Sequence, residues 1–195
     1  MDIKSEKTLC FLSKLLFILY LIVLIWVVVF KCNIAISLTG GYLYFKTITF
    51  HERLLMYIVP FKNYFVAFKM NELIDSIFNC VIFIPLGLYL SYFISKKKLT
   101  MALFLSFGVS LFFELFQLFS LMGSFQTEDL IVNTLGAVIG YLLYKLLYKD
   151  DTKRIYILNW VSIIFLIVLI PLVLFATVNT IINFDLYIAI IGKTY

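Results

Sequence analysis

Five polar or charged side chains could form a binding site within a sequence that is otherwise strongly apolar. They are Asn79, Glu114, Gln117, Asp129 and Asn133, and each lies in or at the edge of a long apolar run. An ionisable group inside a bilayer costs roughly 2.5–3.5 kcal/mol on insertion scales, so it usually faces other helices, a wet cavity or a partner. Carboxylates in such a place can transfer protons, and Glu114 and Asp129 are therefore the candidates for any catalytic role.

Other kinds of chemistry have little support in the sequence. It contains no His or Cys cluster with metal-ligand spacing, no Gly-rich phosphate loop and no nucleophile beside a base. His51 is the single histidine, and the three cysteines are far apart. We therefore expect neither a metal nor a cofactor, and the sequence leaves open whether the protein is an enzyme.

The composition indicates a membrane protein. Hydrophobic residues make up 64% of the 195 residues and charged residues 14%, and the apolar segments are 11–30, 73–95, 99–122, 130–148 and 155–175. Each is close to the roughly 20 residues that cross the hydrocarbon layer as a helix, and none alternates as a membrane β-strand does. We predict an all-α, polytopic membrane protein of about five transmembrane helices, with residues 1–195 forming a single membrane domain.

The distribution of basic residues predicts the orientation. The basic residues near span ends are Lys96, Lys97 and Lys98 in one connection and Lys145, Lys149, Lys153 and Arg154 in another. The connection between them has no Lys or Arg and ends in Glu128-Asp129. The positive-inside rule therefore puts the N-terminus in the cytoplasm and residues 31–72 in an extracytoplasmic or interfacial segment. The net charge of +5 indicates contact with anionic membrane lipids and not with nucleic acid.

With this orientation, the candidate residues converge on the outer side. At 1.5 Å of rise per residue, Glu114 lies about 12 Å below the outer end of its helix, and Asn79 about 9 Å below. Gln117 shares a helix face with Glu114, and Asn133 shares one with Asp129. The sequence therefore predicts one polar site in the outer third of the membrane.

Two further segments bear on this site. The outer segment 31–72 contributes Arg53, a cation that could pair with Glu114, and residues 51–61 could form a short interfacial helix or a re-entrant piece. Residues 177–191 are apolar but interrupted by Asn and Asp, so they either extend the last helix or lie on the surface.

Simpler roles exist for several of these residues. Asn79 and Asn133 could be glue between helices, at about 0.6 kcal/mol each. Gly136 and Gly140 form a G-x-x-x-G pattern that is typical of close helix packing. A proton-coupled transporter or flippase with Glu114 as its titrating group, and a structural or regulatory subunit, are the alternative functions. The inner halves of the predicted helices lack polar groups, which favours a one-sided site over a transport path.

Four sequence patterns, in order, resemble those of the VanZ-like membrane proteins, a family named for a teicoplanin-resistance protein. They are an Arg before a Pro-Phe pair (Arg53 to Phe61), N-x-x-x-F-x-P-x-G (Asn79 to Gly87), E-x-x-Q (Glu114 to Gln117) and a final D-x-x-x-N-T-x-G (Asp129 to Gly136). The resemblance covers residues 53–148. The chain departs from the family pattern at Gly123, where an Arg is usual, and at Gln126 and Glu128, where Asp is usual.

The resemblance implies a role in the bacterial cell envelope, in a multi-pass protein of the cell membrane. Family members are linked to lower susceptibility to lipoglycopeptides such as teicoplanin. The expected partners are membrane lipids together with a lipid-linked cell-wall precursor or a lipoglycopeptide. In that setting Arg53 would hold an anionic headgroup, while the carboxylates and amides of the site would hydrogen-bond it or transfer protons.

Overall fold

The computed structural model describes residues 3–30, 46–61, 70–94, 99–147 and 151–183, and within these ranges the protein is helical and contains no strand. The helices are α1 (Ile3–Phe30), α4 (Phe50–Leu55), α6 (Met70–Phe93), α7 (Leu99–Phe119), α8 (Thr127–Leu147) and α9 (Asp151–Ile182). All but α4 are long and apolar enough to cross a membrane. The predicted class, an all-α polytopic membrane protein, is confirmed.

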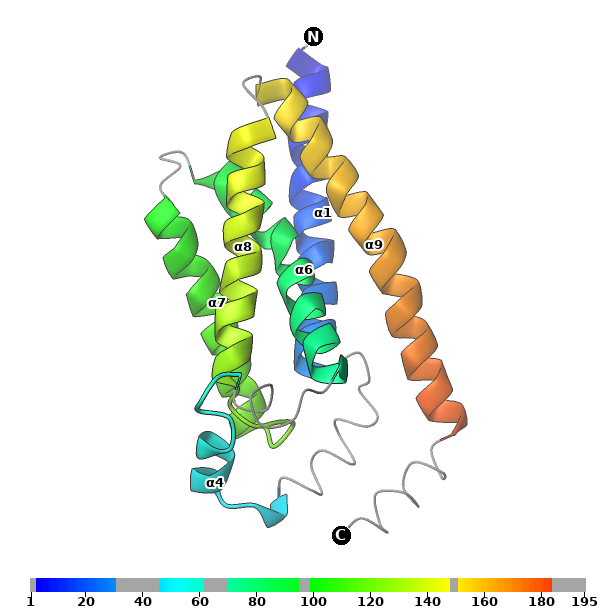
Figure 1. Cartoon of the computed structure of the whole chain (residues 1–195). Coiled ribbons are helices and arrows are strands. Elements are labelled where there is room, and N and C mark those ends of the chain that lie inside the picture. Colours follow the sequence, from blue (N-terminus) through cyan, green and yellow to red (C-terminus); the bar gives the residue numbers. More distant parts are fainter. Residues whose placement is uncertain (1–2, 31–45, 62–69, 95–98, 148–150, 184–195) are drawn as a thin grey trace.

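The five long helices run alternately up and down in one bundle (Figure 1). The start of α1 lies at the same end as the end of α6, the start of α7, the end of α8 and the start of α9; this is the N-terminal end. Helix α4 and the connection between α7 and α8 lie at the opposite end, which we call the α4 end. The helix ends that flank the two basic segments of the sequence therefore share one end with the start of α1, as the charge pattern predicted. The side of the membrane that each end faces remains a prediction.

Helices α6 and α8 form the closest contact of the bundle, and glycine makes it possible. A Cβ atom added to Gly136 would overlap the carbonyl oxygen of Cys80, and one added to Gly140 would overlap that of Ile84. On the facing helix, a Cβ on Gly87 would overlap the carbonyl oxygen of Ala137. The G-x-x-x-G pattern is therefore a packing surface, as expected, because only hydrogen on Cα allows the two backbones to approach so closely.

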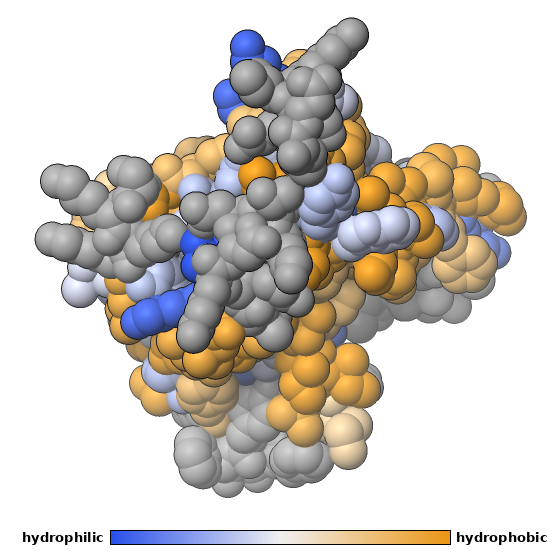
Figure 2. All heavy atoms as spheres, turned by 90° about the horizontal axis from the view of Figure 1, so that it is seen from above, coloured by the Kyte–Doolittle hydropathy of each residue, from blue (hydrophilic) through white to orange (hydrophobic). Residues whose placement is uncertain are grey.

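Side-chain hydroxyls tie α1 and α9 to α6 inside the apolar core. The Tyr20 hydroxyl of α1 donates to the carbonyl oxygen of Ile82 at 2.8 Å. The Tyr89 hydroxyl of α6 lies 2.6 Å from Ser162 Oγ of α9. Outside the core, large apolar side chains cover the flanks of the bundle, as expected of a surface in contact with lipid, and Figure 2 shows many of these hydrophobic atoms from the N-terminal end.

Several helix ends differ from the predicted segments. Helix α1 begins at Ile3 and α9 runs from Asp151 to Ile182, because a helix continues through polar residues once it leaves the hydrocarbon, where hydropathy gives no signal. The last helix is thus extended to Ile182, which decides the open question for the first part of segment 177–191. Its remainder, and residues 31–45 and 62–69 of the outer segment, lie outside the described residues. Helix α7 ends at Phe119, three residues before the end of the predicted segment 99–122.

Candidate functional site

A turn that ends α7 shapes the site at the α4 end. Leu121 has a positive φ of 61°. Among the described non-glycine residues, only Phe61 also has a positive φ. The Met122 and Gly123 amides both donate to the carbonyl oxygen of Gln117, at 3.1 and 3.2 Å. The left-handed residue and the bond from Met122 form a Schellman-type helix end. The helix therefore ends at Phe119 and does not continue to residue 122, because the chain turns back below α7.

Arg53 hydrogen-bonds the C-terminal end of α7. Its Nη1 donates to the carbonyl oxygen of Leu118 at 2.6 Å, and the residue is only 6% exposed. A cation at a helix C-terminus is favourable because the last carbonyls carry partial negative charge. The guanidinium also lies 5.9 Å from the ring of Phe50, which stacks on Phe119 of α7. Arg53 therefore acts as a cap for α7, a role that its position in the sequence did not reveal.

Helix α4, which carries Arg53, begins with a capping box. The Glu52 amide donates to Thr49 Oγ1 at 3.3 Å, and the Thr49 amide donates to Glu52 Oε2 at 2.9 Å. The backbone amide and then the hydroxyl of Thr49 hold the pKa of the Glu52 carboxyl below its ordinary value. A short helix was one of the two alternatives predicted for residues 51–61, and the capping box explains why it begins at Phe50.

Glu114 fixes the other side of the turn. The residue is 0% exposed, and its Oε2 accepts a hydrogen bond from the Gln126 amide at 2.6 Å. Gln126 also forms an isolated bridge with Tyr57, and the Thr127 amide donates to the Tyr57 carbonyl oxygen at 3.3 Å. A carboxylate of α7 thus binds the backbone just before α8. The ion pair between Arg53 and Glu114 that the sequence allows stays a prediction.

Gln117 links the same turn to α1. Its Nε2 donates to the carbonyl oxygen of Val28 at 2.7 Å. Gly123 lies beside it, and a Cβ atom at Gly123 would sit 3.3 Å from both Cβ and Oε1 of Gln117. Gly123, where the sequence pattern of the VanZ-like proteins usually has Arg, is therefore buried against the Gln117 side chain.

The remaining candidates join α6, α7 and α8. Asn79 Nδ2 donates to Asp129 Oδ1 at 3.0 Å, and Asn133 Nδ2 donates to Ser110 Oγ at 2.9 Å. Ser76 also donates to the Glu128 carboxylate. Ser76, Ser110 and Glu128 were not among the candidates. Ser110 could have been found, because it lies four residues before Glu114 and so shares its helix face.

All six predicted site residues lie toward the α4 end, and we call them the polar cluster: Arg53, Asn79, Glu114, Gln117, Asp129 and Asn133. The cluster has hydrogen-bonding capacity left. Among the described residues, Arg53 Nε, Gln117 Oε1 and Asn133 Oδ1 are buried and have no hydrogen-bond partner. A buried polar atom in this state costs roughly 1–3 kcal/mol, which a ligand could recover. The described residues contain no group of His, Cys, Asp and Glu that could hold a metal ion.

This arrangement defines the class: a bundle of five membrane-spanning helices with a buried polar cluster at one end. The family model described as VanZ/LLP1 matches residues 17–148. Protein VanZ of Enterococcus faecium is 31% identical over 160 residues, which cover 81% of this chain and 90% of that protein. The chain belongs to the VanZ/LLP1 family, as its sequence patterns predicted. No solved structure matches it.

Proposed function

We propose that the protein works in the bacterial cell membrane, with the polar cluster toward the outer leaflet. There the cluster binds the polar group of an amphiphile, and this binding lowers susceptibility to lipoglycopeptides of the teicoplanin type. The observation that carries the proposal is the burial of a guanidinium and a carboxylate, Arg53 and Glu114, on the two sides of one turn. Burying charged groups is costly, and neutral residues would serve packing better.

The chemistry of the cluster suits a ligand that is both anionic and rich in hydrogen-bonding groups. Arg53 offers a buried Nε donor, whereas Gln117 and Asn133 offer buried amide oxygens as acceptors. Phosphate and carboxylate groups accept hydrogen bonds from guanidinium, and sugar or peptide groups donate to amide oxygens. Lipid-linked cell-wall precursors and lipoglycopeptides combine such groups with an apolar tail.

The orientation predicted from charge supports this site on the outer side. The α4 end carries the connection between α7 and α8, which has no Lys or Arg, and the N-terminal end carries the helix ends that flank the basic segments of the sequence. The resistance suggested by the family resemblance concerns molecules that act outside the cytoplasmic membrane. The relative from Enterococcus faecium, Protein VanZ, matches over most of its length, so the proposal applies to a shared membrane domain.

Drug response tests the proposal most directly. Expression of the protein in a susceptible Gram-positive host should lower teicoplanin susceptibility more than vancomycin susceptibility, because only teicoplanin carries a fatty tail. Glu114→Gln should abolish the shift while leaving expression and thermal stability near or above wild type. The matched control is Glu52→Gln, which removes the same charge from an exposed residue at the same end and should keep the shift.

A structural role is the competing function, and one observation favours it: Arg53, Glu114 and Gln117 all hydrogen-bond backbone groups. If the cluster only holds the turn, Glu114→Gln preserves both stability and drug response, since an amide oxygen can still accept from Gln126. A well-folded Glu114→Gln protein with the wild-type teicoplanin shift would therefore overturn the binding site and leave the structural role.

A further inference from the structure

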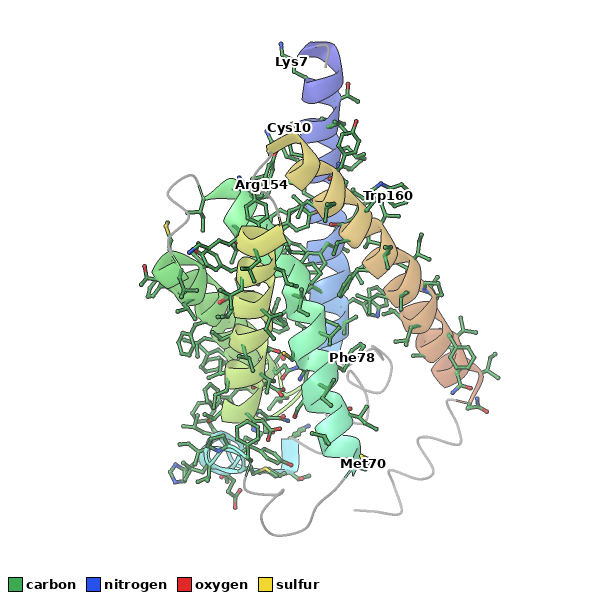
Figure 3. The ribbon with its side chains drawn as sticks, turned by 45° about the horizontal axis from the view of Figure 1, so that its top comes forward. Lys7, Cys10, Met70, Phe78, Arg154 and Trp160 are labelled. Atoms are coloured by element: carbon green, nitrogen blue, oxygen red, sulfur yellow. The ribbon has the colours of Figure 1, made fainter. Side chains whose placement is uncertain are left out.

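A second polar site lies at the opposite end of the molecule from the polar cluster. A cavity of about 80 Å³ opens between α6, α8 and α9 and is lined by Ser91, Tyr141, Tyr144, Lys145 and Arg154. Figure 3 labels Arg154 toward the N-terminal end, where Lys7 also lies, and far from Met70 at the start of α6. We call this space the basic pocket.

Two cationic residues and two tyrosines line the basic pocket, and its five lining residues include no carboxylate. The Arg154 guanidinium lies 5.4 Å from the centre of the Tyr144 ring, where the negative face of the ring attracts it. Tyr141 and Tyr144 are buried, whereas Lys145 is exposed and Arg154 is half-buried. The pocket therefore has a fixed aromatic wall and a positively charged opening.

The pocket lies at the depth of lipid headgroups. Lys145 is next to the last residue of the candidate span Thr127–Leu146, and Arg154 is the first residue of the span Arg154–Asn179. Cations at the ends of spans lie at the boundary between hydrocarbon and water. In the sequence between them, Lys149 and Lys153 are balanced by Asp150 and Asp151, so Lys145 and Arg154 account for the net positive charge of residues 145–154.

We propose that the basic pocket binds the headgroup of an anionic phospholipid through its phosphate, in the leaflet that faces the N-terminal end. Arginine binds phosphate oxygens through its planar set of donors, lysine adds a mobile charge, and tyrosine hydroxyls can donate to the same oxygens. Basic pockets between membrane helices are known to hold anionic headgroups in this way. The cavity has room for a phosphate group, while the acyl chains would lie outside it along the apolar flanks. This lipid would hold α8 and α9 together without taking part in the outer site.

Native mass spectrometry of the whole purified protein can test the proposal. The protein would be titrated with phosphatidylglycerol, with phosphatidylcholine and with inorganic phosphate. We expect retained phosphatidylglycerol adducts and no comparable phosphatidylcholine adducts. Lys145→Gln/Arg154→Gln should weaken phosphatidylglycerol binding by roughly tenfold or more, because each cation near a membrane surface contributes about 1 kcal/mol toward an anionic lipid.

The matched control is Lys7→Gln/Lys14→Gln, which removes the same charge from exposed residues of α1 that do not line the pocket. It should keep phosphatidylglycerol binding within about twofold of wild type, since the charge lost is then outside the site.

Arg154→Lys retains the positive charge of the pocket and should keep the preference for phosphatidylglycerol over phosphatidylcholine. It is the control for loss of binding through misfolding. Equal losses in the two double variants would overturn the proposal, because they would show attraction to net charge alone. Equally tight binding of inorganic phosphate would overturn the assignment to a lipid.

Discussion

Arg53 and Arg154 lie at opposite ends of the bundle and are held in opposite ways. Arg53 is almost completely buried and donates to one backbone carbonyl oxygen at 2.6 Å, at the end of α7. Arg154 is half-buried, rests over the ring of Tyr144 and borders a cavity. The cation at the α4 end is thus buried against a backbone carbonyl oxygen, whereas the one at the N-terminal end lies over an aromatic ring beside an open cavity. The same residue type serves as part of a turn at one end and as part of a surface at the other.

The strongest test of this comparison asks which end faces outward, because its result is all or none. In a background without the native cysteines, His51→Cys at the α4 end and Lys7→Cys at the N-terminal end are both exposed positions. A membrane-impermeant maleimide added to intact cells should label His51→Cys and leave Lys7→Cys unlabelled until the membrane is opened. Labelling of Lys7→Cys in intact cells would reverse the orientation and remove the outer-leaflet site.

The two arginines should respond very differently to replacement by lysine. Arg53→Lys should cost about 1–3 kcal/mol of stability, because the Leu118 carbonyl oxygen loses its partner in a buried place. Arg154→Lys should change stability by less than about 0.5 kcal/mol, as is usual for a substitution near the surface. Thermal unfolding in one detergent, with drug response measured alongside, compares them. Similar shifts for both variants would show that Arg53 is not a specific cap.

A smaller effect is expected from the contact between Asn133 and Ser110. Asn133→Leu alone leaves the Ser110 hydroxyl buried without this partner, and Ser110→Ala alone leaves the amide of Asn133 in the same state. The double variant should recover part of the loss, with a coupling energy near the roughly 0.6 kcal/mol that is typical of such pairs in membranes. If the double variant folds well and also retains the teicoplanin shift, Asn133 is glue between helices and not part of the ligand site.

The smallest expected effect concerns the capping box of α4 and its dependence on pH. The pKa of Glu52 is lowered in the folded protein from the ordinary value of 4.5, chiefly by the Thr49 amide. This contribution to stability is present above the unfolded pKa and is lost as the pH falls through the folded pKa. Thr49→Ala should therefore reduce the acid-side decline of thermal stability slightly, and Thr49→Ser should restore it. An unchanged pH profile for Thr49→Ala would show that the box is too exposed to matter.

The sequence predicted the helices and most of the polar cluster because both depend on composition along one helix. Asn79, Glu114 and Asn133 stand out against apolar neighbours, and helix periodicity places them on inner faces. The capping role of Arg53 could not be predicted in this way. It depends on the turn at Leu121, where the left-handed residue is a leucine and not the usual glycine, and on a contact between residues 65 positions apart. The basic pocket was missed for a similar reason: its cations were interpreted only as signals of orientation.

The glycine contact between α6 and α8 also has a consequence for how the protein is made. Asn79 of α6 and its partner Asp129 of α8 are separated by 50 residues of chain, and α7 lies between them in the sequence. At synthesis rates of roughly 5–20 residues per second, α6 enters the membrane about 3–10 s before the surface that completes it. During that interval the amide of Asn79 and the flat face around Gly87 have no α8 to bind. A membrane insertase or chaperone that shields α6 for those seconds would prevent it from pairing with the wrong helix.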